Sequence, residues 1–153
     1  MVSKRKFLGV ALATFVTVNF TGCGLLDFET TAKPQFEVTP LRDEAKPISF
    51  SPSKPYGCMI VGEREGKANA SGTRGATKEL LRTSARNDLR NEATHLIQLG
   101  QSKRFLVYIS KETAICDLQG REVNCASIPV SQGQQEPLPR AYRVFGEVYE
   151  CKW

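Results

Sequence analysis

Residues 78–99 read KELLRTSARNDLRNEATHLIQL, and this stretch predicts the fold more strongly than any other. Leucine and alanine recur at positions 81, 85, 89, 93 and 96, in steps of four, four, four and three. Residues at these steps share one face of an α-helix. Thr77 is a typical N-cap residue and Gly100 a typical stop. The pattern therefore predicts an amphipathic helix over 78–99, although Arg82 and Glu92 fall within the apolar arc.

The opposite face of this helix is polar and carries four side chains in two adjacent pairs: Arg86, Asn87, Arg90 and Asn91. The ordinary interpretation is a solvated surface, and the functional one is a patch that binds a partner. His95, the only histidine of the chain, lies on the flank of the apolar face. It is the one imidazole that could act as a general base, and no second histidine is present to share a metal ion.

Runs of strand-forming residues lie on both sides of the helix, at 59–63, 104–110 and 142–151. Two further runs, 113–118 and 122–128, flank Gln119-Gly120 and predict a hairpin. The short patch 48–50 could add an edge strand. Together these features predict an α+β fold, in which one amphipathic helix packs on a small antiparallel sheet of three to five strands.

The N-terminus has the three parts of a secretory signal. Lys4, Arg5 and Lys6 precede the apolar residues 7–18, and Gly22-Cys23 follows. A glycine-cysteine pair at the end of an apolar run resembles the site where bacterial lipoproteins are cleaved and acylated. We therefore expect a lipoprotein signal peptide at 1–22 and lipid attachment, such as palmitate, at Cys23. The alternatives are an ordinary cleaved signal and a transmembrane anchor, for which the apolar run is shorter than the usual span of about 20 residues.

Composition argues against a nucleic-acid partner. The chain has 21 Lys+Arg and 16 Asp+Glu, but three basic residues belong to the signal, which leaves 18 − 16 = +2 for residues 23–153. No run of five like charges follows the signal. Because prolines recur through 34–55 and interrupt helices and central strands, we expect a Pro-rich tether at 23–55. A single α+β lipoprotein domain should then occupy 56–153.

Four cysteines remain after Cys23: Cys58, Cys116, Cys125 and Cys151. An even number in an exported chain predicts two disulfides, for which three pairings exist. Cys116 and Cys125 lie on either side of the predicted hairpin turn, where two strands would bring them within bridging distance. No Cys-x-x-Cys pair is present, so we expect no metal site and no cofactor.

Two further features have both a functional and an ordinary interpretation. Residues 66–76 are rich in glycine, but Thr77-Lys78 stands in the reverse order of the lysine-hydroxyl pair of a phosphate loop. A mobile surface loop is the ordinary interpretation, and an anion site the functional one. Glu63 and Glu147 each follow a glycine inside a strand-like run, and a pair of carboxylates could perform acid–base chemistry.

The YjeI-like bacterial lipoproteins, whose domain has no known function, resemble this chain in three segments: CMIVG at 58–62, ARNDLRNEA at 85–93 and GEVYEC at 146–151. More loosely, the tethered helix-and-strand layout with disulfides is similar to RcsF, an outer-membrane lipoprotein that senses envelope stress. The resemblance implies a bridge between Cys58 and Cys151, with Cys116 and Cys125 as the second pair. It supplies no catalytic residues.

We therefore expect a lipid-anchored lipoprotein of the bacterial cell envelope, in the outer membrane facing the periplasm, that acts as a non-enzymatic interaction or sensor module. Its partners would be the membrane, through the N-terminal lipid, and another envelope protein. The alternative is a small envelope hydrolase or a cell-wall-binding protein. An exposed apolar patch would favour the first function, and a deep cleft lined by titratable groups would favour the second.

Overall fold

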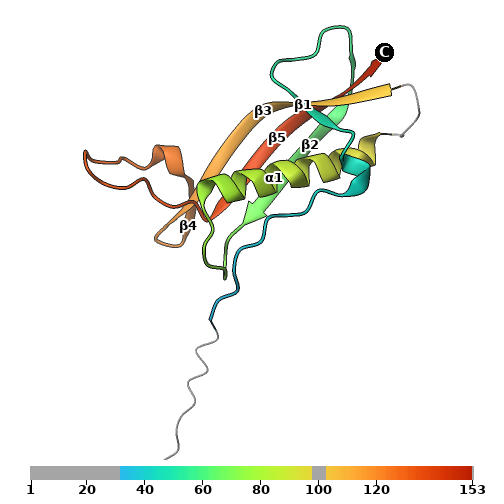
Figure 1. Cartoon of the computed structure of the whole chain (residues 1–153). Coiled ribbons are helices and arrows are strands. Elements are labelled where there is room, and N and C mark those ends of the chain that lie inside the picture. The colour runs from blue at the N-terminus through green and yellow to red at the C-terminus, as the bar shows by residue number, and fades with distance from the viewer. Residues whose placement is uncertain (1–31, 98–102, 153) are drawn as a thin grey trace, which may run out of the picture. The chain divides into compact units, whose positions relative to one another are not determined.

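The computed structural model describes residues 32–97 and 103–152, and it places one α-helix of this part of the chain against a five-stranded sheet (Figure 1). The predicted α+β fold is confirmed. The elements are β1 (Ser49–Ser51), β2 (Met59–Asn69), α1 (Lys78–Ala93), β3 (Lys103–Leu118), β4 (Arg121–Asn124) and β5 (Ala141–Lys152), with 3₁₀ turns at Asp43–Ala45, Thr94–Leu96 and Cys125–Ser127.

β3 and β5 form the centre of the sheet, whose strand order is β1-β3-β5-β2, and β4 pairs with the far end of β3. β5 is antiparallel to both of its neighbours. β1 is parallel to β3, so the sheet is mixed and not purely antiparallel as predicted. The prediction assumed neighbours joined by hairpins, whereas β1 reaches the sheet edge from the N-terminal segment and no tight turn sets its direction.

The predicted apolar stripe of the helix forms the core. Leu81, Ala85, Leu89 and Ala93 are completely inaccessible to solvent. They pack in one cluster with the sheet residues Phe105, Val107, Tyr142, Val144 and Val148. Full burial of one leucine or valine side chain contributes about 1.5–3 kcal/mol, so this layer is the main source of stability.

The helix begins where predicted but ends earlier. Thr77 Oγ1 accepts a hydrogen bond from the Leu80 N–H at 3.2 Å, as an N-cap does. α1 stops at Ala93 rather than at 99, because Thr94 turns its hydroxyl back to the Asn91 carbonyl and a 3₁₀ turn follows. Residues 98, 99 and 100 lie outside the described residues. No helix within the described ranges is long and apolar enough to cross a membrane.

The strands are longer than predicted. β2 continues through Gly66 to Asn69, so the first part of the predicted loop 66–76 is strand. Gly66 is buried beneath α1, where a Cβ would overlap the Ala85 carbonyl oxygen and lie 2.6 Å from Leu89 Cβ. A glycine is needed here because the two backbones approach too closely for any side chain. Of the predicted strand 122–128, only the part up to Asn124 is strand, because β4 ends there and a 3₁₀ turn follows.

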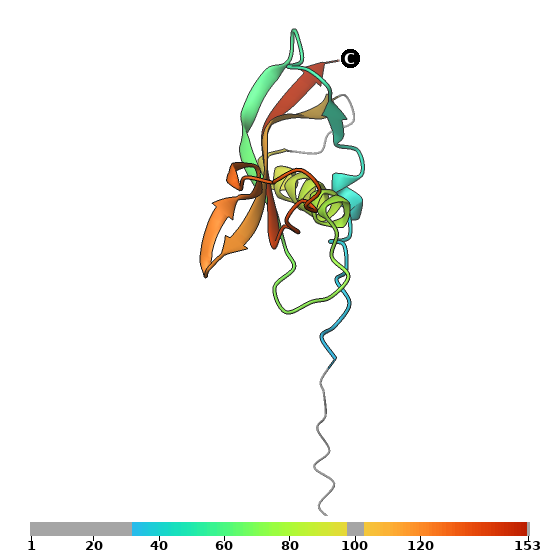
Figure 2. The same cartoon turned by 90° about the vertical axis from the view of Figure 1, so that its left-hand side faces the viewer.

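The N-terminal segment from Ala32 onward belongs to the domain, so the predicted tether over 23–55 is wrong in its described part. Phe36, Ala45 and Ile48 are buried, and the segment runs alongside α1 before it enters β1 (Figures 1 and 2). Prolines prevent long helices and central strands, but they do not prevent an irregular segment from packing. Residues 23–31 lie outside the described residues.

The predicted disulfides are confirmed. Cys58 and Cys151 join the start of β2 to the end of β5, with 4.5 Å between their Cα atoms. Cys116 and Cys125 bridge β3 to the turn after β4, with 5.0 Å between their Cα atoms. The hairpin between β3 and β4 projects beyond the sheet (Figure 2) and turns at Gln119 and Gly120, both with positive φ.

Candidate functional site

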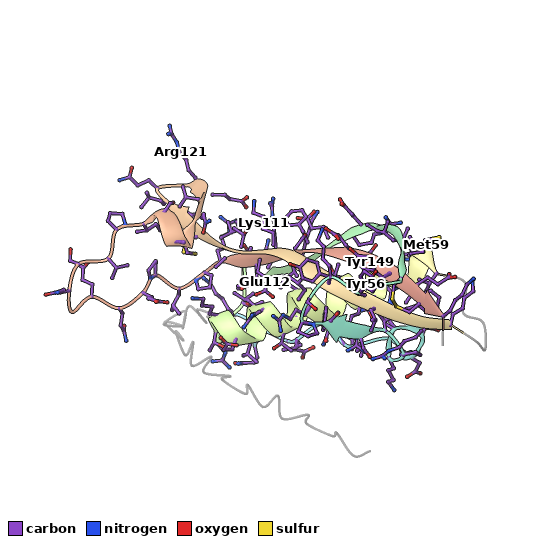
Figure 3. The ribbon with its side chains drawn as sticks, turned by 90° about the horizontal axis from the view of Figure 1, so that it is seen from above. Tyr56, Met59, Lys111, Glu112, Arg121 and Tyr149 are labelled. Atoms are coloured by element: carbon purple, nitrogen blue, oxygen red, sulfur yellow. A yellow bond between two sulfur atoms is a disulfide. The ribbon has the colours of Figure 1, made fainter. Side chains whose placement is uncertain are left out.

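Glu112 of β3 faces α1 because of a β-bulge. Ile109 pairs with Gly146 of β5, while Lys111 pairs with Phe145, so Ser110 is an extra residue in β3. Side chains alternate between the two faces of a strand, and one extra residue reverses the alternation. Figure 3 accordingly shows Lys111 on the far side of the sheet and Glu112 on the side of α1. Without the bulge, a lysine would face the arginines of the helix.

Two arginines from consecutive turns of α1 hold the Glu112 carboxylate. Arg82 Nη2 lies 2.7 Å from Oε2, and Arg86 Nε lies 2.7 Å from Oε1. The Tyr142 hydroxyl of β5 lies 3.4 Å from Oε2. Only 17% of the Glu112 side chain is exposed. This pairing explains why an arginine at position 82 is tolerated within the apolar arc of the helix. Its charge is paired with the Glu112 carboxylate at the edge of the core.

The pairing decides the charge state of this cluster. Burial alone would raise the pKa of Glu112, but the hydrogen bonds and positive charges of Arg82 and Arg86 hold the pKa below its ordinary value. The hydrogen bond to Glu112 raises the pKa of Arg82. Burial, together with the Glu112 charge, raises the pKa of Tyr142. Glu112 is therefore ionised at neutral pH and has no spare oxygen with which to act as a base.

Glu112→Gln should lower the free energy of unfolding by about 2 kcal/mol at neutral pH, because charge-assisted hydrogen bonds contribute roughly 1.5–3 kcal/mol. A carboxylate whose pKa is lowered in the folded state stabilises the folded protein fully at pH values above its unfolded-state pKa. This stabilisation is lost as the pH falls through its folded-state pKa. The difference between wild type and variant should therefore shrink on acidification. Urea unfolding of both proteins at a series of pH values measures this difference in unfolding free energy.

Glu122→Gln is the matched control, since Glu122 forms a more exposed pair with Arg143 at 3.4 Å. Exposed pairs of this kind contribute less than about 1 kcal/mol. A Glu112→Gln difference that stays constant from neutral to acidic pH would contradict the role of the Glu112 charge.

Two pockets meet at Glu112. One, of about 580 Å³, lies between Phe50 of β1, Arg86 of α1 and the β3 residues 108–112. The other, of about 430 Å³, lies between Glu112, Tyr142 and the loop after β4, including Ile128 and Pro137. Both are lined by Glu112, and we call these two adjoining pockets along β3 the β3 groove.

The β3 groove follows a stretch of strand edge that is unpaired within the described residues. Ile115 pairs with β5 through Ala141 and with β4 through Asn124, so β4 lies on the edge of β3 away from β5. β1 lies on the same edge, opposite residues 106–108. Residues 109–114 lie between these two partners. Apart from the bulged Ser110 they pair only with β5, so their outward N–H and C=O groups have no strand neighbour among the described residues.

The predicted partner-binding residues mostly bind the chain's own N-terminal segment. Asn87 donates to the Thr39 carbonyl at 2.9 Å, and Asn91, only 3% exposed, binds Arg42 N–H and Pro40 C=O. Arg90 donates to the carbonyls of residues 45 and 46. These three side chains are thus engaged by the segment predicted to be a tether, and Asn91 is buried beneath it, whereas Asn87 and Arg90 stay half-buried.

Arg86 alone of the four predicted residues lines the β3 groove. Its guanidinium lies 5.7 Å from the centre of the Phe50 ring, and that of Arg90 lies 5.8 Å from the same ring. Such stacking fixes β1 on the helix. The sequence offered no sign of Glu112, because only the bulge turns it toward these arginines.

The suggested carboxylate pair does not have the properties of an acid–base pair. Glu63 and Glu147 are neighbours across β2 and β5. Hydrogen bonds from Tyr149 and Lys54 lower the pKa of Glu147, whereas a general acid needs a raised one. His95 lies exposed in the 3₁₀ turn after α1. Within residues 32–97 and 103–152, no group of three or more His, Cys, Asp or Glu could hold a metal ion.

Comparison with known proteins finds no matching family model, no matching curated protein and no matching solved structure. The β3 groove and its unpaired edge are therefore interpreted from their own geometry. A strand edge and an adjoining groove suit the binding of an extended chain, whereas a carboxylate neutralised by two arginines does not suit catalysis.

Proposed function

We propose that this chain is a lipid-anchored lipoprotein of the bacterial envelope, attached through Cys23, whose domain is a non-enzymatic interaction or sensor module. The observation that carries the proposal is that all four cysteines after Cys23 are paired as disulfides. Disulfides persist in exported proteins and are rare in the cytosol. The signal-like residues 1–22 and the resemblance to YjeI-like lipoproteins and to RcsF support the same assignment.

The chemistry of the site favours binding over hydrolysis. A small hydrolase would need a carboxylate or imidazole poised to exchange protons near neutral pH. Glu112 and Glu147 both have lowered pKa values, because basic and hydroxyl side chains hold their carboxylates. The alternative of a small envelope hydrolase is thus disfavoured, while binding of a cell-wall polymer remains a variant of the interaction class.

Exposed apolar side chains also favour an interaction module. Tyr56, Met59 and Ile60 are among the most exposed large apolar residues of the described chain, and they lie close together in sequence at the start of β2. Figure 3 shows Tyr56 and Met59 at the same end of the sheet. Adjoining exposed apolar residues are typical of surfaces that contact other molecules.

The packing of the N-terminal segment limits how far the domain can stand from the membrane. Only 32 − 23 = 9 residue steps separate Cys23 from Ala32, the first residue of the compact domain. At 3.3–3.6 Å per step, they span at most about 30 Å. Ala32, where the compact domain begins, should therefore lie within about 30 Å of the membrane surface.

Cys23→Ala should abolish lipid attachment, so the protein should lose labelling by radioactive palmitate and leave the membrane fraction or retain its signal. Thr21→Ala is the matched control, because it keeps Cys23 and a small residue at the junction. The control should be labelled like wild type. Undiminished labelling and membrane association of Cys23→Ala would contradict the proposed anchor.

A further inference from the structure

We propose that the unpaired edge of β3 at residues 109–114 binds an extended segment of a partner protein as an added strand, with apolar side chains toward α1 and acidic side chains toward Lys111. This inference rests on the proposed function, since it gives the interaction module a binding site and a class of ligand. It is carried by the position of the unpaired edge, by the β3 groove beside it and by the charges around it.

The edge has room for one short strand. β1 and β4 occupy the same side of β3 on either side of residues 109–114. Six residues of strand extend about 20 Å. The 3₁₀ turn Cys125–Ser127 also contacts β3 next to the end of β4, so the added segment has at most this length. Backbone groups of successive residues point to opposite sides, so about half of the N–H and C=O groups here point to the open side. An added strand would pair with them, as in other strand-addition complexes.

The edge of β2 is a poorer candidate. Asp88 of α1 accepts a hydrogen bond from the Lys67 N–H at 2.8 Å, so a side chain of the helix already takes one backbone donor of that strand. β2 also carries a bulge between Ile60 and Gly62. Bulges and blocking side chains protect strand edges from pairing. The β3 edge also has a bulge, but its residues 111–114 form an unbroken register with β5.

The surroundings select the side chains of the added strand. On the side of α1, the β3 groove offers the Phe50 ring and the stem of Arg86, which suit an apolar side chain. On the other side, the exposed Lys111 forms none of the ion pairs found among the described residues. Arg82 and Arg86 share the single carboxylate of Glu112, so this cluster keeps one net positive charge, while Lys78 lies 3.4 Å from Glu136. The exposed Lys111 adds a further positive charge, and this excess of positive charge favours an acidic segment.

The test uses the full-length chain, labelled with ¹⁵N and purified in detergent, and two capped hexapeptides of alternating valine and glutamate or valine and lysine. The glutamate peptide should shift the amide signals of residues 109–114 and give cross-peaks between its backbone and theirs. Lys111→Glu should weaken its binding roughly five- to tenfold and should strengthen binding of the lysine peptide, because the charge is exchanged. Arg121→Glu, an equal change of charge at an exposed β4 residue, should alter binding less than about twofold.

Several results would overturn the inference. They are the absence of amide shifts at 109–114, shifts confined to β2, equal binding of both peptides, or pairing of these amides with a second copy of the chain, seen as dimers in sedimentation. The peptides act on purified protein, so this experiment does not depend on lipid attachment. If the peptides do not bind at residues 109–114 but Cys23→Ala loses palmitate labelling as expected, the β3 edge is rejected as a binding site and the proposed function stands.

Discussion

Gly66→Ala should destabilise the domain by about 3 kcal/mol or more, because it places a methyl group between β2 and α1. The added Cβ would overlap the Ala85 carbonyl oxygen and the Leu89 amide nitrogen, which are backbone atoms of the helix. A side chain can rotate away from a clash, but a helix backbone can relieve it only if the whole helix moves off the sheet. Overpacking usually costs about 1–3 kcal/mol, and contact with an immobile backbone belongs at the upper end or beyond.

Urea unfolding measures this difference, and Gly146→Ala is the matched control. Gly146 lies under the same helix, but its added Cβ would meet the side-chain atoms Val107 Cγ1 at 2.7 Å and Leu89 Cδ2 at 2.9 Å. These tips can adjust, so we expect a smaller loss, of about 1–2 kcal/mol. Neither glycine has a positive φ, so alanine has no backbone strain at either site. A Gly66→Ala variant as stable as wild type would show that the helix is not held as closely as the structure indicates.

Removal of the Cys58–Cys151 disulfide, by changing both cysteines to alanine, should lower the free energy of unfolding by about 4 kcal/mol and Tm by roughly 15 °C. The two cysteines are 93 residues apart in sequence, so the bridge closes most of the domain into one loop. In the chain-entropy model, a long loop restricts the unfolded chain more than a short one does. The bridge also joins the two strands β2 and β5 at the end of the sheet where Tyr56 and Met59 are exposed.

Removal of the Cys116–Cys125 disulfide in the same way provides the comparison. These cysteines are 9 residues apart, and for so small a ring the chain-entropy model gives a loss of unfolding free energy below about 3 kcal/mol. The hairpin also keeps its turn, since Gly120 N–H donates to Asp117 Oδ1 at 2.8 Å without the bridge. Thermal unfolding of both double variants, under non-reducing conditions, ranks the two losses. An equal or larger effect of the hairpin bridge would contradict the expectation.

The apolar stripe of α1 could be predicted from the sequence because helical periodicity follows from the local geometry of the chain. Leu81, Ala85, Leu89 and Ala93 must share one face of any helix that contains them, and they form the core. The N-cap at Thr77 and the hairpin turn at Gln119-Gly120 are equally local, and both are present. The pairing of the cysteines was open from the sequence alone, since three pairings exist, and the resemblance to YjeI-like lipoproteins favoured the one observed.

The β3 groove, in contrast, was decided only by tertiary structure. Glu112 faces α1 because Ser110 is an extra residue in the pairing of β3 with β5, and the register of two strands is a long-range property that alternation in one strand does not reveal. Likewise, Asn87, Arg90 and Asn91 are polar residues on a helix surface, and nothing local tells whether water or another segment covers them. The residues of the predicted tether cover them because Phe36, Ala45 and Ile48 bury apolar surface there, which the prolines between them do not prevent.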